Sequence, residues 1–273
     1  MTKAQKHLEK AIQIQPEFVE AHYELAMILK EKGENSKSKE HLLKAIDIQP
    51  EFSQAHFQLA LLLNDLEDHK ASCEYFTQAI ELDQNFADAH YHYGLLLADL
   101  EEYEEAKNNL EKATDIDQNY SMAYYHLAKL LIDPEDYEQA KKNYLTAIDI
   151  DGSIAEAHYY LGKLLSGGVK NDKDGTLVRK PEYDNAILHY KKAISINKNY
   201  AKAHYNLALV YKIQKNYDDS HKHIERAIKI MKDYSKAHFH LAMLLKETGE
   251  VSDSKRSKST LDVKNKASAR SKN

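Results

Sequence analysis

The 273-residue chain has 42% hydrophobic and 30% charged residues, with only 8 Gly and 4 Pro. So little Gly and Pro excludes collagen, low-complexity linkers and turn-rich β-sandwiches, and it favours a mostly helical protein. The formal net charge of −5 is uneven, because residues 252–273 hold seven Lys or Arg residues against two Asp residues. The chain therefore has an acidic body and a basic tail.

Cysteine use and hydropathy indicate the compartment. The single cysteine, Cys73, has no partner for an intramolecular disulfide, which suits a reducing environment. The first twenty residues lack the run of roughly 7 to 15 apolar residues of a signal peptide, and no later stretch approaches the roughly 18 residues of a transmembrane helix. We therefore expect an intracellular, cytoplasmic protein with no transmembrane segment.

A tetrad that begins with Ala and ends with Ile or Leu recurs along the chain. It begins at Ala11, Ala45, Ala79, Ala113, Ala147, Ala193 and Ala227, so that successive copies are 34 residues apart, except for one spacing of 46. A second motif, AHYELA in its first copy at Ala21, begins ten residues after each tetrad. Self-similarity at a fixed period of this length indicates a repeat protein.

The period and motifs resemble the tetratricopeptide repeat, a unit of helix, tight turn and second antiparallel helix. We number each unit so that position 1 is Val19, Ser53, Ala87, Ser121, Ala155, Ala201 or Ser235. Positions 8 and 20 are then always small, and position 24 is always large and apolar. The resemblance implies an all-α fold, a right-handed superhelical solenoid of about seven helix pairs with partial units at the ends.

The pattern also divides the chain. A half unit at 1–18 precedes repeats that start at 19, 53, 87, 121, 155 and 201, and a partial repeat starts at 235. We expect the solenoid to span 1–251 and the Ser/Lys-rich tail, 252–273, to be disordered. The repeat from Ala155 is twelve residues longer than the others, and its Gly and Pro residues predict an inserted loop at 167–182.

An aromatic residue occupies position 5 in every unit. The resemblance implies that positions 2, 5, 6, 9, 12 and 13 of the first helices line a concave groove, and aromatic side chains are frequent anchors of protein interfaces. The position-5 residues are Tyr23, Phe57, Tyr91, Tyr125, Tyr159, Tyr205 and Phe239. We expect them to bind a partner, with packing between repeats as the alternative or additional role.

Polar and charged residues surround this aromatic row. His92, His126 and Asn206 occupy position 6, and Lys163 and Lys202 also fall on groove positions. Charges at groove positions are mostly acidic up to Asp133 and mostly basic after it, which would orient a ligand of opposite polarity. A solvated surface without a partner is the alternative.

Histidine is abundant, with 15 residues, and occupies position 4 in six of the seven units, where the family usually has Trp. No two are placed four apart as a helical zinc pair, so we expect no metal site and no cofactor. Buried neutral imidazoles at position 4 would make the fold sensitive to acid. No phosphate-binding loop, nucleophile elbow or acid and base pair occurs, so we expect no enzymatic activity.

Three functions remain open. The first is a scaffold that binds a protein or peptide segment in the groove. The second is a structural subunit that packs laterally or end to end, as a homo-oligomer or within a larger complex, because the half unit leaves an apolar edge. The third is a polyanion tether through the tail, although the tail has no aromatic residue for base stacking, so nucleic acid is not the expected partner.

Overall fold

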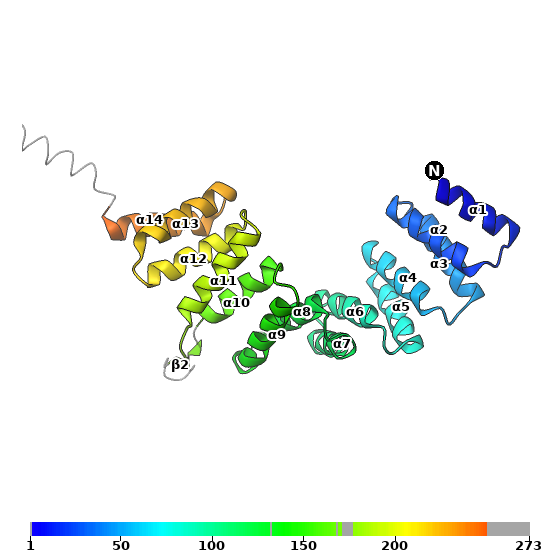
Figure 1. Ribbon diagram of the computed structural model, residues 1–273, viewed down its shortest axis with the longest axis horizontal. Coiled ribbons are helices and arrows are strands. Elements are labelled where there is room, and N and C mark those ends of the chain that lie inside the picture. Colours follow the sequence, from blue (N-terminus) through cyan, green and yellow to red (C-terminus); the bar gives the residue numbers. More distant parts are fainter. Residues whose placement is uncertain (1, 132, 168, 171–176, 250–273) are drawn as a thin grey trace, which may run out of the picture. The chain divides into compact units, whose positions relative to one another are not determined.

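The computed structural model describes residues 2–131, 133–167, 169–170 and 177–249. The chain divides into two compact units, Met1–Ile150 and Asp151–Asn273, called unit 1 and unit 2. In both units, successive helices pack as antiparallel hairpins (Figure 1). Within the described ranges, no helix is long and apolar enough to cross a membrane.

Unit 1 consists of helices joined by short turns. Its helices are α1 (Lys3–Ile14), α2 (Val19–Glu31), α3 (Asn35–Ile48), α4 (Ser53–Asp65), α5 (His69–Leu82), α6 (Ala87–Asp99), α7 (Tyr103–Ile116), α8 (Ser121–Leu130), the short 3-10 helix η1 (Pro134–Asp136) and α9 (Tyr137–Ile150). Helices α2, α4, α6 and α8 begin at position 1 of their repeats, and each packs against the next long helix. We call these the first helices, and α3, α5, α7 and α9 the second helices.

Unit 2 continues the pattern with one interruption. Its elements are α10 (Ala155–Ser166), β1 (Val169–Lys170), β2 (Leu177–Arg179), α11 (Tyr183–Ile196), α12 (Ala201–Ile213), α13 (Tyr217–Ile230) and α14 (Ser235–Thr248). Strands β1 and β2 pair antiparallel inside the insertion that the sequence predicts as a loop. The inserted segment predicted at 167–182 therefore contains a short two-stranded hairpin.

The turn between the two helices of a repeat uses a left-handed residue at position 15. In four complete repeats that residue is Gly33, Glu67, Glu101 or Lys215, with φ between 60° and 74°. A left-handed residue after a helix lets the chain reverse while its backbone N–H groups bond to the last carbonyls, as Glu101 N–H does to Ala98 O at 3.2 Å. Glycine adopts this conformation without the steric cost that a Cβ imposes.

Replacing Glu101 by Gly should therefore stabilise unit 1 by about 1 kcal/mol, because it removes that cost. Urea unfolding followed by circular dichroism measures the change. Glu102→Gly is the control, since Glu102 has a φ of −86° and gains nothing from glycine. Equal effects of the two substitutions would contradict this explanation of the turn.

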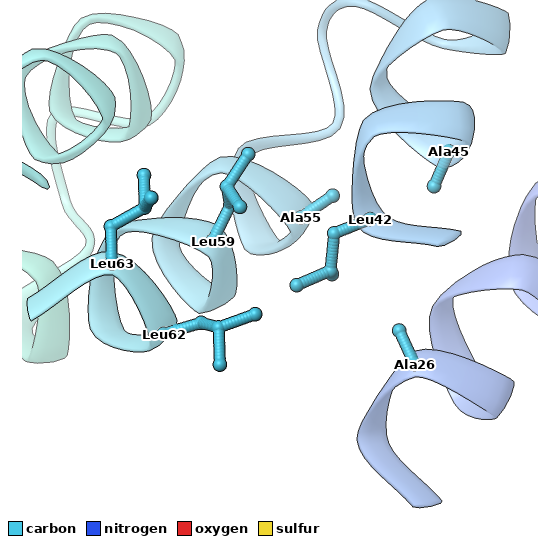
Figure 2. Close-up of a cluster of buried hydrophobic side chains, with 7 residues drawn as sticks. All are labelled: Ala26, Leu42, Ala45, Ala55, Leu59, Leu62 and Leu63. Carbon is cyan, nitrogen blue, oxygen red and sulfur yellow. The ribbon is translucent and has the colours of Figure 1, made fainter. Parts of the chain in front are cut away.

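The core lies between each first helix and its neighbours. In Figure 2, Leu42 and Ala45 of α3 lie with Ala26 of α2 and Leu59 of α4 in one buried cluster. Position 24, here Leu42, is buried in all six complete repeats and inserts beside the small residue at position 8. Close approach of the helices requires a small residue at this point, which explains the strict small and large pattern.

A hydrogen bond fixes the same contact in three repeats. The Oγ atoms of Ser38, Ser72 and Ser220, all at position 20, donate to the backbone carbonyls of Ala26, Ala60 and Ala208 at 2.8–2.9 Å. These serines are fully buried, so each hydroxyl satisfies its hydrogen-bonding capacity inside the helix pair. The remaining complete repeats have Ala at this position.

Candidate functional site

The first helices form one continuous side of each unit, which we call the first-helix face. In unit 1, α4 contacts α6 and α6 contacts α8, and in unit 2 α10 contacts α12. Residues at positions 2, 5, 6, 9, 12 and 13 of these helices therefore share a surface. This is the surface on which the sequence places the candidate binding residues.

The position-5 aromatic rings are largely inside this surface. Five of them, Phe57, Tyr91, Tyr125, Tyr159 and Tyr205, are only 6–7% exposed, whereas Tyr23 is half-buried. Phe239 on α14 is 62% exposed. The alternative role in packing is thus present for the buried rings, and their role in binding a partner stays a prediction.

Five of the position-5 rings pack against an aromatic ring at position 34, just before the next first helix, whereas position 34 of the repeat from Ser121 is Ile154. The ring centroids are 4.8–5.2 Å apart in Tyr23–Phe52, Phe57–Phe86, Tyr91–Tyr120, Tyr159–Tyr200 and Tyr205–Tyr234. Tilted aromatic pairs at this distance stabilise the contact beyond their buried area. The aromatic row therefore joins successive repeats.

The position-6 residue of the following repeat contacts the position-5 ring. His92 lies 5.7 Å from the ring of Phe57 and His126 lies 5.8 Å from that of Tyr91. In unit 2, Asn206 donates from Nδ2 to the hydroxyl of Tyr159 at 3.0 Å. Burial lowers the pKa of His92, and it lowers the pKa of His126 to about 4 with a further contribution from Lys129. Both imidazoles are neutral near pH 7.

Charged residues rim the face and pair across repeats. Lys30 at position 12 lies 3.8 Å from Asp65 at position 13 of the next repeat. Lys212 and Glu247 repeat this pairing in unit 2 at 3.0 Å. This pairing was not predicted from the sequence, although both members occupy regularly spaced positions.

Two lysines named from the sequence, Lys163 on α10 and Lys202 on α12, are exposed on this face. On unit 1, Asp88 is also exposed and accepts a hydrogen bond from the Tyr120 hydroxyl at 2.7 Å. Burial and this carboxylate raise the pKa of Tyr120, so the phenol remains a donor.

A pocket of about 290 Å³ in unit 1 lies between α6 and α8, and α7 contributes two of its lining residues, Tyr103 and Leu110. Its lining residues combine an apolar floor with a charged rim, and they are Leu95, Ala98, Asp99, Tyr103, Leu110, His126, Lys129 and Leu130. Of the residues predicted from the sequence to bind a partner, this pocket contains His126. A concave apolar site with a few polar groups is the usual form of a small binding pocket.

Hollows also occur beside the second helices. Their volumes are about 530 Å³ beside His22 and His41, about 820 Å³ between α5 and α7, and about 410 Å³ beside His204 and His223. They are larger than the pocket between α6 and α8, but they lie in the grooves that any stack of helices leaves between neighbours.

Five of the six position-4 histidines, His22, His56, His90, His158 and His204, are buried, whereas His238 on α14 is exposed. The Nδ1 atoms are 2.9–3.0 Å apart in three pairs with position 23, namely His22–His41, His158–His189 and His204–His223. His22 Nε2 donates to the Pro16 carbonyl at 2.9 Å, so its neutral ring accepts at Nδ1 and His41 donates. The sequence analysis did not identify the position-23 partners, although His41, His189 and His223 follow the repeat period.

Within the described part of the chain, no group of three or more His, Cys, Asp or Glu side chains is arranged to hold a metal ion. The tail at 252–273, for which a tether function was considered, lies outside the described residues.

Sequence comparisons identify the repeat along much of the chain. A model described as "Tetratricopeptide repeat" matches residues 19–52, 53–86, 87–120 and 123–154, and a second of the same description matches 201–234. A model described as "TPR repeat" matches residues 177–215. No curated protein matches the chain.

Many solved structures are similar in fold. PilF of Pseudomonas aeruginosa aligns with a TM-score of 0.68 at 20% identity, over 82% of this chain and 97% of that chain. YrrB, described as a TPR protein with an unusual peptide-binding site, aligns with a TM-score of 0.59 at 24% identity, over 73% of this chain and 96% of that chain. MamA from Desulfovibrio magneticus RS-1 aligns with a TM-score of 0.56 at 17% identity, over 67% and 97% of the two chains. At these identities the likeness concerns the fold alone.

Proposed function

Because this chain belongs to the tetratricopeptide repeat family, we propose that it binds a segment of a protein partner on its first-helix faces. The repeats support a role as a protein–protein interaction scaffold, and proteins of this family are generally non-catalytic. The binding face, the residues and the class of ligand are our proposal. A cytoplasmic location belongs to it as well, and cell fractionation tests that part.

The pocket between α6 and α8 is the observation that carries this proposal. Its floor includes Leu95 and Leu130, while Asp99 and Lys129 stand exposed at its rim. An apolar side chain of a partner would fill the floor, and a neighbouring polar or charged group would meet the rim. His126, neutral near pH 7, adds an uncharged polar wall.

The charges on each face indicate the ligand's character. On unit 1, the exposed acidic residues Glu20, Glu24, Asp88 and Asp99 outnumber the basic ones at the groove positions. On unit 2, Lys163 and Lys202 are exposed, whereas Lys212 is already paired with Glu247. We therefore expect unit 1 to prefer a basic segment and unit 2 an acidic one, both with salt-dependent association rates.

Because most position-5 rings are buried, substituting them is a poor test of binding. Changing Tyr91, Tyr125 or Tyr159 to Ala would remove packing that each repeat needs, so loss of binding would not identify a contact. YrrB, which is described as having a peptide-binding site, gives a precedent for a peptide ligand in this fold. The useful variants change exposed or half-buried residues of the face.

Ala98→Arg should abolish binding, because Ala98 lines the pocket and an arginine would occupy it. Ala98 is half-buried, so the longer side chain extends toward solvent without unfolding the helix. Affinity capture from the source cells, quantified by mass spectrometry, should show partners that are retained by the unmodified chain and reduced at least about tenfold by the variant.

The matched control is Asn108→Arg, which adds the same charge at an exposed position of the second helix α7. It should capture the same partners as the unmodified chain. If Ala98→Arg keeps every partner while Asn108→Arg loses one, the contact runs over the second helices and the proposal fails. Circular dichroism of both variants excludes unfolding as the cause.

A further inference from the structure

The helix α14 is a first helix without a described second helix. Ala242, at position 8, is exposed, although the corresponding alanines of complete repeats, such as Ala26 and Ala60, are fully buried. Phe239 and Met243 on the same helix are 62% and 41% exposed. No described element covers this face, which in a complete repeat packs against the second helix.

The helix α1 shows the reverse situation. Its sequence places Ala4, Leu8 and Ala11 at positions 20, 24 and 27. Every complete repeat buries these three positions against its first helix, whereas Ala4 is exposed and Leu8 and Ala11 are half-buried. Helix α1 is thus a second helix whose first-helix contact surface no described element covers.

We propose that α14 of one copy and α1 of a second copy together form one complete repeat, so that the chain assembles head to tail. The small Ala242 would receive Leu8 as Ala26 receives Leu42 in the buried cluster of Figure 2. A second copy is favoured as the partner of α14 because residues of its α1 would repeat, between the two copies, the contacts that complete repeats make internally. Three of these contacts are specific.

The first is a histidine pair. His238 occupies position 4 and its Nε2 lies 2.9 Å from the Lys232 carbonyl, as His22 Nε2 does from Pro16. Its side chain is exposed, and α1 carries His7 at position 23. Position 23 is the place of His41, which pairs with His22. In the assembled repeat, His7 of the second copy would pair with His238 in the same way.

The second contact is aromatic. Phe18 stands at position 34 of the half unit and is 39% exposed, while Phe239 stands at position 5 and is 62% exposed. In five of the six complete repeats these two positions hold a tilted aromatic pair, for example Phe57 and Phe86 with centroids 4.8 Å apart. Joining two copies would bring Phe18 onto Phe239 and bury both ends of the aromatic row.

The third contact is an ion pair. Position 12 of one repeat and position 13 of the next hold Lys30–Asp65 and Lys212–Glu247. Across the junction the same positions hold Lys246 and Glu31, both exposed. Their charges are complementary only in the head-to-tail register, so the pair favours this arrangement over others.

The residues that follow α14 in sequence fit the second-helix pattern poorly. They would place Lys258 at position 24, where all complete repeats have a large apolar residue, and Leu261 at position 27, where all have Ala. Helix α1 offers Leu8 and Ala11 at those positions. A second copy's α1 therefore matches the exposed face of α14 better.

This contact is heterologous, since two different surfaces meet, and repeated addition gives a ring or an open filament. It goes beyond the proposed function, because it uses the chain's two end helices and leaves the pocket between α6 and α8 free.

Sedimentation velocity of the 273-residue chain, from about 1 µM to about 1 mM, tests the assembly. We expect the average mass to rise with concentration. Phe239→Glu and Ala4→Arg each block one end and should lower the association constant at least about tenfold. Leu188→Glu is the control, because Leu188 on α11 is as exposed as Phe239, at 63%, but lies away from both ends.

A mixture of the two blocked variants separates this contact from any symmetric one. Phe239→Glu keeps a working α1 and Ala4→Arg keeps a working α14, so the mixture should form a 1:1 complex that grows no further. Lys246→Glu and Glu31→Lys should each weaken association, and the double variant should restore it. A chain that stays monomeric throughout, or association that neither blocking variant weakens, would overturn the proposal.

Discussion

Replacing Gly162 by Leu is expected to destabilise unit 2 by about 3 kcal/mol, because the helix pair α10 and α11 leaves no space there. An added Cβ at Gly162 would lie 3.0 Å from two ring carbons of Tyr190. That ring is 1% exposed, and its hydroxyl lies 3.1 Å from Ser166 Oγ. The ring is therefore confined and cannot move away without breaking its contacts. Urea unfolding followed by circular dichroism measures the loss.

Gly167→Leu is the matched control for this prediction. A Cβ at Gly167 would meet only two carbonyl oxygens at 3.6 Å, an ordinary contact, and the residue is exposed. Its substitution should change the free energy of unfolding by less than about 0.5 kcal/mol. Equal destabilisation by the two substitutions would show that the small residue at position 8 is not what the Tyr190 ring requires.

Acid should destabilise the chain strongly through its buried histidines. Burial lowers the pKa of His158 and of His223 to about 4, with the partner imidazole contributing in each pair. Burial also lowers the pKa of His189 and His204. A folded pKa below the unfolded value of about 6.5 means that the stabilisation is complete above that pH and is lost as the pH falls toward 4.

For each imidazole that stays neutral in the folded state, the free energy of unfolding falls by up to about 1.4 kcal/mol per pH unit in this window. Two imidazolium rings cannot keep an Nδ1–Nδ1 hydrogen bond, because both nitrogens are donors, so the pairs break when both histidines protonate. We expect the melting temperature to fall by about 10 °C between pH 7.5 and 5. Calorimetry across this range measures it.

The control replaces the position-23 partners, with His189→Asn and His223→Asn. Asparagine is native at this position in two repeats, as Asn109 and Asn143, and Asn109 Oδ1 lies 2.9 Å from His90 Nδ1. The double variant keeps a hydrogen-bond acceptor but removes two titrating rings. Its melting temperature should fall by about half as much as that of the unmodified chain, and an unchanged fall would contradict the assignment to the histidine pairs.

The repeat period was enough to predict the helical hairpins, because the small and large residues at positions 8, 20 and 24 reflect one packing rule. Val19, Ser53 and Ala87 mark the starts of first helices as the numbering predicts. The β1–β2 hairpin was not predicted, since it lies in an insertion with no counterpart in other repeats.

The candidate site was predictable only in part. The period places Tyr91 and Phe57 on the first helices, but it does not show how deeply each ring is buried, which depends on packing between repeats, such as that of Tyr120 against Tyr91. Side-chain pairs between helices could also not be predicted from the sequence of a single repeat. His204 and His223 are 2.9 Å apart at Nδ1, yet their link becomes apparent only when positions 4 and 23 are compared across repeats.

The most direct test of the proposed function is site-specific photo-crosslinking. A benzophenone amino acid would replace Lys129 or Lys163 on the first-helix faces, and Lys142 or Lys192 on the second helices α9 and α11 as controls, all four being exposed lysines. After irradiation in the source cells, we expect partner adducts from Lys129 and Lys163 and none from the controls. Adducts from Lys142 and Lys192 alone would place the partner on the second helices and contradict the proposal.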